Sequence, residues 1–463
     1  MFQHTVIKKN KFIGIWGFGI VGKAAVHYFH AQGYQLGVMD KRQLTSQELD
    51  YLKARNITWY SQEQQELFLN FYEVIIFSPG VNVSQLCYAT HKNKWLHELD
   101  FFYSIFNKPI IAITGSIGKT STTHLLSQIC KEASIPVALG GNIGIPTFDL
   151  INQKDIVNYA LLEVSSFQLN YCKSFAPFLA IITNFYPNHL DHHANEQEYF
   201  LAKDNILRQQ TKDQLSLIPF ILRNKVSPAL DEHKRSYFIT SCPEMKELSN
   251  LKNTEQIYYI NENKVVMRYS QYQHIPIMTI STALLNLSFI DNILLLAAVC
   301  DLLKINTKLF KTIAPSLQLP EHRIEKIGSI NSIDFYNDSK ATTTASTLAA
   351  VKKLHNRPLH LFLGGLSKGV DRAPFIAQLK NHVKHIYCFG KEAIMLYTMC
   401  LNNNISATYF STLADAVNAC VAAIHPGDCV LLSPAGSSFD LYENYEQRGK
   451  HFKDLINHYI QKI

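Results

Sequence analysis

The residues best suited to chemistry are a lysine and two hydroxyl groups at the end of a short glycine loop. The sequence Gly-Ser-Ile-Gly-Lys-Thr-Ser at 115–121 directly follows an apolar segment, 110–114, that is patterned as a strand. In such a loop the backbone N–H groups and the start of the next helix bind phosphate oxygens. Lys119 would reach the β- and γ-phosphates, and the hydroxyl of Thr120 or Ser121 would bind Mg²⁺. The order of strand, loop, Gly-Lys-Thr and helix favours this shortened P-loop over a tight turn with a surface lysine.

A second glycine loop near the N-terminus points to another phosphate-bearing ligand. Gly-Phe-Gly-Ile-Val-Gly at 17–22 links a predicted strand to a predicted helix, and Asp40 ends the following strand. Dinucleotide sites have this pattern, with the acidic residue on a ribose. A nicotinamide enzyme would not need the ATP loop that follows, so a pyrophosphate-containing substrate is favoured over NAD. Ser-Pro-Gly at 78–80 is either part of this site or an ordinary turn.

Two further segments carry candidate metal ligands. Glu163 ends a predicted strand at 159–163, and a carboxylate at the tip of a strand beside a P-loop strand is where a magnesium ligand belongs. The segment 184–193 contains three histidines and one aspartate, in a spacing that matches no zinc pattern. His189 is either close to Mg²⁺ or part of a hydrogen-bonded loop. Lys203, on a predicted helix, would ordinarily be a solvated surface lysine.

The last third of the chain places three polar loops after predicted strands. The loops are 337–342, 364–369 and 433–438, and Arg323 precedes them. Because parallel strands bring their carboxyl ends to one edge of a sheet, these Arg, Asp, Lys and Ser side chains are expected to share a site. Such groups suit a carboxylate-bearing ligand. The sequence has no G-x-S-x-G elbow and no Ser–His–Asp order, so a hydrolase nucleophile is not indicated.

Alternating strands and helices must position these loops. The pattern predicts α/β architecture in three domains: a Rossmann-like domain at 1–107, a P-loop ATPase-like domain at 108–319 and a Rossmann-like domain at 320–463. The stretch 211–281 is polar and broken, with the pattern of short strands and turns, and a buried helix is expected at 293–300. The remaining predicted elements are a helix at 21–32 and strands at 12–16, 35–39, 74–77, 179–183, 332–336, 359–363, 385–389 and 430–433.

Composition narrows the class of protein. The 463 residues carry a formal net charge of +7 with scattered lysines and arginines, which suits anionic small molecules, and no nucleic-acid partner is expected. The nine cysteines occur without a C-x-x-C pair, as in reduced cytosolic proteins. No run approaches 18 apolar residues, and glycines at 14–22 interrupt the only segment that could be taken for a signal peptide. We therefore expect a cytoplasmic protein without membrane insertion.

Taken in order, these motifs resemble those of the Mur ligase family of peptidoglycan-building enzymes, and the likeness covers essentially the whole chain. It is strongest to the D-glutamate-adding branch of that family, because of Ser-Ser-Phe-Gln-Leu at 165–169 and Glu-Gln-Arg-Gly at 446–449. The other motifs that carry it lie at 78–81, 115–120, 140–144, 162–168, 189–191, 321–323, 337–342 and 433–449.

The resemblance implies a reaction. The family phosphorylates the carboxylate of a UDP-muramoyl substrate with ATP, and the amine of an amino acid then attacks the acyl phosphate. For this chain it implies UDP-N-acetylmuramoyl-L-alanine and D-glutamate as substrates, ATP and two Mg²⁺ ions as cofactors, and a cytoplasmic monomer. Such a ligase would serve cell-wall biogenesis, cell shape and cell division.

The resemblance also implies roles for individual residues. Catalysis would depend on Lys119, Glu163, His189 and Lys203. Metal binding would fall to Thr120, Glu163, His189 and a carbamylated Lys203. ATP would be bound by Gly115, Ser116, Gly118, Lys119, Thr120, Ser121, Asn292, Arg323 and Asp338. The UDP group would be bound by Gly19, Asp40, Lys41, Arg42, Ser78 and Gly80, with Asn142 and Ser165 lining the pocket near the metal. D-Glutamate would be positioned by Lys340, Thr342, Lys368, Ser438, Phe439 and Tyr445.

Some positions depart from the family pattern. Ile117 replaces a polar residue inside the ATP loop, and Leu295 replaces an asparagine expected near the adenine. Asn188 and Ser367 stand where many relatives have aspartate. Three other interpretations remain: an amide ligase for another amino acid or for folate, a nicotinamide dehydrogenase built on 17–22, and a non-catalytic nucleotide-binding regulator. Folate enzymes lack the UDP-binding domain, and the retained phosphate and metal groups argue against a regulator.

Overall fold

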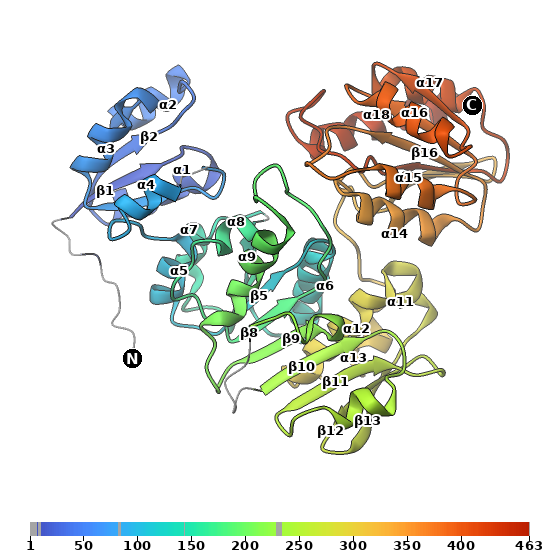
Figure 1. The fold of residues 1–463 in the computed structure, drawn as a ribbon, viewed down its shortest axis with the longest axis horizontal. Coiled ribbons are helices and arrows are strands. Elements are labelled where there is room, and N and C mark those ends of the chain that lie inside the picture. The colour runs from blue at the N-terminus through green and yellow to red at the C-terminus, as the bar shows by residue number, and fades with distance from the viewer. Residues whose placement is uncertain (1–6, 8–10, 82–84, 143, 228–233, 463) are drawn as a thin grey trace.

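The computed structural model describes residues 7, 11–81, 85–142, 144–227 and 234–462. Figure 1 shows three lobes, with the N-terminal lobe (blue) and the C-terminal lobe (orange to red) on the same side of the central one. Each lobe is built on its own sheet. The predicted three-part α/β architecture is thus confirmed. Within the described residues, no helix combines the length and the apolar character needed to cross a bilayer.

The first sheet has four parallel strands in the order β3-β2-β1-β4. The predicted strands at 12–16, 35–39 and 74–77 are all present, and the predicted helix begins one residue earlier than expected, at Ile20. The short strand β3 was not predicted. The elements are β1 (Phe12–Trp16), α1 (Ile20–Ala31), β2 (Gln35–Met39), α2 (Ser46–Lys53), β3 (Thr58–Tyr60), α3 (Gln65–Phe71), β4 (Val74–Phe77) and α4 (Gln85–Thr90).

The central sheet has nine strands in the order β13-β12-β11-β10-β9-β8-β5-β7-β6. It is parallel from β6 to β11 and antiparallel from β11 to β13. The strands are β5 (Ile110–Thr114), β6 (Val137–Gly141), β7 (Tyr159–Glu163), β8 (Leu179–Ile182), β9 (Leu215–Pro219), β10 (Lys234–Ile239), β11 (Glu255–Ile260), β12 (Val265–Ser270) and β13 (Gln273–Thr279). The polar stretch 211–281 therefore extends this sheet and does not form a separate unit.

Helices cover both faces of the central sheet. Along β5, Ile111 and Ile113 face one hydrophobic cluster, whereas Ile110 and Ala112 face another, as the two-residue period of a strand requires. Both faces are buried, which explains why β5 is an uninterrupted apolar run. The helices are α5 (Glu98–Phe106), α6 (Lys119–Glu132), α7 (Thr147–Leu150), α8 (Ser166–Leu169), α9 (Glu196–Arg208), α10 (Met245–Ser249), α11 (Thr282–Leu287), α12 (Ile290–Leu302) and α13 (Leu309–Ile313).

The third sheet has six strands in the order β14-β15-β19-β16-β17-β18, and only β14 is antiparallel to its neighbour. Helices α14, α15 and α16 pack on one face, and α17 and α18 pack on the other. The elements are β14 (Glu325–Ile330), β15 (Ile333–Asn337), α14 (Thr344–Leu354), β16 (Leu359–Gly364), α15 (Ala373–Leu379), β17 (His385–Phe389), α16 (Ala393–Asn402), β18 (Ala407–Phe410), α17 (Leu413–Val421), β19 (Cys429–Leu432) and α18 (Tyr445–Lys462).

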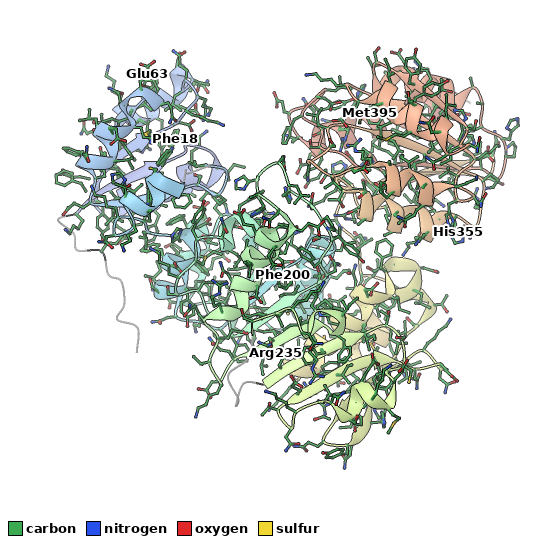
Figure 2. All side chains as sticks on the ribbon, viewed as in Figure 1. Phe18, Glu63, Phe200, Arg235, His355 and Met395 are labelled. Carbon is green, nitrogen blue, oxygen red and sulfur yellow. The ribbon has the colours of Figure 1, made fainter. Side chains whose placement is uncertain are left out.

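The first and central lobes share one continuous hydrophobic core. Phe29 of α1 lies 5.1 Å from Phe101 of α5 and 5.7 Å from Phe148 of α7, measured between ring centroids. The same core cluster includes Ile13 of the first sheet and Ile110 of the central sheet. The third lobe has clusters of its own. Figure 2 shows the buried side chains of Phe18 in the first lobe and Phe200 in the central lobe.

Candidate functional site

The glycine loop after β5 has the geometry of a phosphate-binding loop. Gly115 and Gly118 have φ values of +144° and +84°, and a Cβ atom on Gly115 would lie 1.9 Å from the Thr183 hydroxyl oxygen. Helix α6 begins at Lys119, so its N-terminus points at the loop. The Lys119 ammonium donates to the backbone oxygen of Gly115 at 2.8 Å, and burial lowers its pKa. The loop thus holds a cation beside free helix N–H groups.

The apolar residue inside the loop does not disturb its backbone. The Ile117 N–H donates to Oδ1 of Asn184 at 2.9 Å, and the Ile117 carbonyl accepts from the Thr183 hydroxyl at 2.6 Å. Asn184 Nδ2 also donates to the same carbonyl, at 3.0 Å. Residues 183 and 184 directly follow β8, the strand next to β5. The loop conformation is therefore fixed from the neighbouring strand and needs no polar side chain at 117.

Glu163 is a buried carboxylate with one unused oxygen. It ends β7, on the other side of β5, and is 2% exposed. Its Oε1 accepts from Asn142 Nδ2 at 3.1 Å, whereas its Oε2 has no hydrogen-bond partner among the described residues. A buried, unpaired carboxylate oxygen is costly unless a cation occupies the position next to it. With the nearby Thr120 hydroxyl, this donor set fits Mg²⁺, which binds one or two protein oxygens and completes its shell with phosphate and water.

Lys203 is buried, although the sequence pattern of its helix predicted a solvated surface lysine. It lies on α9, is 2% exposed, and its Nζ donates to the backbone oxygen of Gly115 at 2.9 Å. Lys119 donates to the same oxygen. Burial, and next the Lys119 charge, hold the pKa of Lys203 well below its usual value. The neutral amine is the nucleophilic form of lysine.

His189 lies close to the same loop with its imidazole held neutral. Burial, followed by the charges of Lys368, Lys119 and Lys203, lowers the pKa of His189 to about 2. A neutral imidazole has a free lone pair and is the metal-binding form of histidine. In the described part of the chain, no group of three or more His, Cys, Asp or Glu side chains is arranged as a metal site. A hydroxyl, one carboxylate and phosphate oxygens are ligands that suit Mg²⁺.

A cavity of about 1410 Å³ joins the three lobes. Its walls bring together eleven of the residues predicted for substrate or metal binding: Gly19, Asp40, Lys41, Arg42, Ser78, Gly80, Thr120, Asn142, Glu163, Lys340 and Tyr445. They come from all three lobes, and most follow or end a strand, whereas Thr120 lies in the first turn of α6 and Tyr445 begins α18. The cavity therefore runs from the first glycine loop to Thr120, directly after the phosphate-binding loop.

The first-lobe end of the cavity is rigidly built. Asp40 accepts from the backbone N–H of Phe18 at 2.7 Å and of Arg42 at 3.0 Å, so its carboxylate fixes the two ligand-binding segments relative to each other. The Ser78 hydroxyl donates to the Gly17 carbonyl at 2.9 Å. A Cβ atom on Gly22 would lie 1.8 Å from that same carbonyl, so the tight turn requires glycine there. The segments 17–22 and 78–80 therefore contact each other and together form this end of the cavity wall.

The third lobe contributes two cationic side chains near the phosphate-binding loop. Arg323 Nη1 lies 3.6 Å from Oδ1 of Asp338, and Oδ2 of Asp338 accepts from the Ser433 hydroxyl at 2.9 Å. Burial raises the pKa of Asp338 to about 6, although the Arg323 charge acts in the opposite direction. The Lys340 ammonium lies 5.0 Å from the centre of the Tyr445 ring, and burial lowers its pKa to about 8.

A second, smaller pocket lies between the central and third lobes, with Lys368 on its wall. Lys368 Nζ donates to the Thr342 hydroxyl at 3.0 Å, and burial lowers the pKa of this lysine to about 8. The Lys368 carbonyl accepts from the N–H of Leu190, in the loop that carries His189, at 3.1 Å. As predicted, the loops after β15, β16 and β19 meet at one edge, because these strands are neighbours in the sheet.

Of the other predicted site residues, Thr342 and Lys368 line the smaller pocket. Thirteen line neither pocket: Gly115, Ser116, Gly118, Lys119, Ser121, Ser165, His189, Lys203, Asn292, Arg323, Asp338, Ser438 and Phe439. The Ser165 hydroxyl accepts from the N–H of Gln168 and caps α8, and Gln168 lines the cavity in its place. Phe439 is 72% exposed and lines neither pocket, and Ser438 is buried outside them. Asn292 lies beside the phosphate-binding loop, because a Cβ on Gly118 would be 3.1 Å from its Oδ1. Leu295 is a buried core residue of α12.

Several wall residues were not predicted from the sequence. In the large cavity they are His124, Gln168 and Glu446, and in the small pocket they are Ser367 and Arg372. His124 follows the phosphate-binding loop by one helical turn, so its position on α6 could have indicated it. Ser-x-x-Gln at 165–168 is a capping-box pattern. This pattern could have identified Ser165 as the helix cap and left Gln168 as the residue that faces the cavity. No local pattern marks Arg372.

Comparisons with known proteins agree with this geometry. Three family models match the chain: the Mur ligase MurD-like N-terminal domain at residues 11–95, the Mur ligase middle domain at 113–300, and the Mur ligase glutamate ligase domain at 322–436. The chain is 30% identical over 455 residues to a UDP-N-acetylmuramoylalanine–D-glutamate ligase of Acidobacterium capsulatum, covering 97% of this chain and 96% of that protein. It is also 30% identical over 454 residues to the ligase of that name from Christiangramia forsetii, covering 96% and 99%.

Solved structures share the fold. The MurF ligase of Thermotoga maritima in complex with ADP aligns with a TM-score of 0.58 at 13% identity, covering 99% of this chain and 97% of that one. The UDP-N-acetylmuramate–alanine ligase MurC of the same organism aligns with a TM-score of 0.54 at 15% identity, covering 98% and 100%. At these identities the likeness concerns the arrangement of the three lobes.

Proposed function

The chain belongs to the Mur ligase family of ATP-dependent amide ligases, and we propose that the cavity between its three lobes is where the reaction takes place. The enzyme adds D-glutamate to UDP-N-acetylmuramoyl-L-alanine in peptidoglycan precursor synthesis. The observation that carries the proposed location is the lining of one cavity by the first glycine loop, Glu163 of the central lobe and Lys340 of the third lobe.

The reaction needs activation because a carboxylate and an ammonium group do not condense in water. The terminal phosphoryl group of ATP passes to the carboxylate of UDP-N-acetylmuramoyl-L-alanine, giving an acyl phosphate and ADP. The D-glutamate amine then attacks the acyl carbon, the new C–N bond forms, the C–O bond to phosphate breaks, and the amine loses a proton. Lys119 stabilises the charge on the phosphoryl group during the first transfer.

Two Mg²⁺ ions would neutralise phosphate charge at this site. Thr120 and Glu163 would hold the first, a role supported by the unpaired Oε2 atom of Glu163. His189, with its neutral imidazole, would help to hold the second, and a carbamylated Lys203 would supply an anionic oxygen ligand there. Asn142 orients Glu163 through its hydrogen bond.

Carbamylation of Lys203 is supported by the burial of its amine, which lowers the pKa of this lysine and so favours the nucleophilic form. We expect enzyme prepared and assayed without carbon dioxide and bicarbonate to lose about 10-fold or more of its activity, and added bicarbonate to restore it, because the unmodified amine supplies no anionic oxygen ligand for Mg²⁺. The isosteric Lys203→Met variant should be inactive and insensitive to bicarbonate. Unchanged activity in the carbon-dioxide-free wild type would contradict the carbamate.

The substrates would divide among the lobes. ATP would lie on Gly115, Ser116, Gly118, Lys119, Thr120 and Ser121, with Asn292 beside the loop and Arg323 and Asp338 from the third lobe. The UDP group would bind to the lining residues of the first lobe. D-Glutamate would bind to Lys340, Thr342 and Lys368, with Ser438, Phe439 and Tyr445 completing its site and Ser165 acting through Gln168. We propose sequence boundaries at 1–107, 108–319 and 320–463, with α5, the last helix of the first segment, packed against α7 and α8 as part of the central lobe.

The cellular setting follows from the substrates. ATP and UDP-linked sugars are cytoplasmic metabolites, so we infer that the enzyme acts in the cytoplasm. Because one chain lines the entire cavity, a monomer would be sufficient for catalysis. A ligase at this step would support cell-wall synthesis, and through it cell shape and division.

The test is phosphate release by purified protein with ATP, Mg²⁺ and UDP-N-acetylmuramoyl-L-alanine, with and without D-glutamate. We expect sustained release only when all components are present, with one phosphate for each amide formed. Release with another amino acid but not with D-glutamate would retain the ligase and replace the substrate. Fractionation of cells and light scattering of the pure protein would test the location and the monomer.

A further inference from the structure

A buried arginine lies beneath the two loops that carry Lys368 and Ser438. Arg372 directly precedes α15 and is 2% exposed. Its Nη2 atom donates to the Gly365 carbonyl at 3.2 Å. A Cβ atom on Gly436 would lie 2.3 Å from the same Nη2, so the guanidinium group needs glycine at that position to fit. Arg372 therefore packs against the loop 364–369 and the loop 433–438 at once.

The two loops are themselves joined through their backbones. The N–H of Leu366 donates to the Ser437 carbonyl at 2.9 Å, and the reciprocal bond is also 2.9 Å. The N–H of Gly364 donates to the Pro434 carbonyl at 3.0 Å. A displacement of one loop would therefore move the other, and the guanidinium group of Arg372 lies where both can be held.

A carboxylate connects this arginine to the residue before Lys368. Nη1 of Arg372 lies 3.4 Å from Oε2 of Glu392. The Ser367 N–H donates to Oε1 and Oε2 of Glu392 at 3.0 and 3.2 Å, and the Ser367 hydroxyl donates to Oε1 at 3.3 Å. The connected series of Arg372, Glu392 and Ser367 thus ends one peptide unit from Lys368. The contact between Arg372 and Glu392 is an ion pair without a hydrogen bond from Nη1, whereas the Ser367–Glu392 bonds are charge-assisted hydrogen bonds, which restrict a loop more than neutral ones do.

We propose that Arg372, acting with Glu392, is a positioning residue that sets where Lys368 presents its ammonium group to a carboxylate of D-glutamate. The inference rests on the proposed function of Lys368 in binding that substrate. In the described part of the chain, the Arg372 side chain contacts Gly365, Gly436 and Glu392, none of which is assigned to ATP or to the UDP group. Its removal would therefore affect the amino acid and leave the other two substrates alone.

The test is steady-state kinetics of Arg372→Met, which keeps most of the side-chain volume and removes the guanidinium group. We expect KM for D-glutamate to rise about 10-fold or more, kcat to fall less than about 3-fold, and KM for ATP and the UDP-substrate to stay within about 2-fold, because uniform binding is lost and not transition-state stabilisation. Glu392→Gln keeps an acceptor for Ser367 and should raise KM for D-glutamate about 3-fold.

Arg357→Met is the matched control. Arg357 also donates to backbone carbonyls, those of Gly427, Asp428 and Ser332, but at the opposite edge of the same sheet. It should lower thermal stability without changing KM for D-glutamate. Equal KM values in Arg372→Met and wild type, or equal rises in Arg372→Met and Arg357→Met, would overturn the positioning role. A wild-type enzyme that does not use D-glutamate would overturn the proposed function, and this inference with it.

Discussion

Replacing Lys119 by alanine is expected to lower phosphate release by about 10³-fold or more, because the site loses the cation that stabilises charge on the transferred phosphoryl group. The Lys119 ammonium lies against the loop, where it donates to the carbonyls of Gly115 at 2.8 Å and of Ser116 at 3.3 Å. No other side chain in the first turn of α6 can replace it, since the residues that follow carry hydroxyl groups. Initial rates at saturating substrates measure the effect.

The comparison that isolates this role uses a lysine with similar local bonding. Lys94 donates to the carbonyls of Leu69 at 2.6 Å and of Asn70 at 3.4 Å, in the first lobe, whereas Lys119 donates to carbonyls of the phosphate-binding loop. Lys94→Ala should keep activity within about 2-fold, as expected for a residue outside the site. The Lys119→Ala protein should still bind UDP-N-acetylmuramoyl-L-alanine in calorimetry, because the first lobe is unchanged. Retention of more than about a tenth of wild-type activity in Lys119→Ala would exclude the role assigned to Lys119.

The second large effect is expected from Glu163→Gln. The substituted side chain has the same shape and can still accept from Asn142, but an NH₂ group replaces the unpaired Oε2 atom. We expect kcat to fall about 10²-fold or more and half-saturation by Mg²⁺ to move to about 10-fold higher concentration, because an amide nitrogen cannot bind a cation. Phosphate release measured over a range of Mg²⁺ concentrations gives both values.

Glu98 offers a buried carboxylate for comparison in the same lobe. Its Oε1 accepts from the Thr147 hydroxyl at 2.5 Å and its Oε2 from Gln168 Nε2 at 3.5 Å, so neither oxygen is left for a metal. Burial raises the pKa of Glu98. Glu98→Gln should therefore keep the Mg²⁺ dependence of the wild type. If Glu163→Gln and Glu98→Gln shift the half-saturating Mg²⁺ concentration equally, Glu163 supports the structure of the lobe and is not a metal ligand.

Much of the site could be predicted because its residues stand at strand tips. Lys119 and Glu163 follow or end two adjacent strands, β5 and β7, whose apolar runs are evident in the sequence. The glycine loops were equally clear, since their close backbone contacts leave no room for a side chain. Local pattern and three-dimensional position coincide at such points.

Other features depended on contacts that no local pattern contains. The strands from β9 to β13 were predicted only as short strands without defined bounds in the stretch 211–281, because the outer strands β12 and β13 are half-exposed and carry polar residues. Lys203 was indistinguishable from a surface lysine, since its burial comes from packing against the phosphate-binding loop. Arg372 and Glu392 lie far apart in the sequence and meet only because β16 and β17 are neighbours.

The shared aromatic core of the first two lobes has a consequence for substrate choice. Phe29, Phe101 and Phe148 lock the helix after the first glycine loop to the helices of the central lobe. At the proposed sites, this shared core would hold the pyrophosphate of one ligand and the phosphoryl donor of the other at one separation. We therefore expect a sugar nucleotide with a longer or shorter arm before its carboxylate to place that group out of reach. Such an enzyme would select its acceptor by length as well as by chemistry.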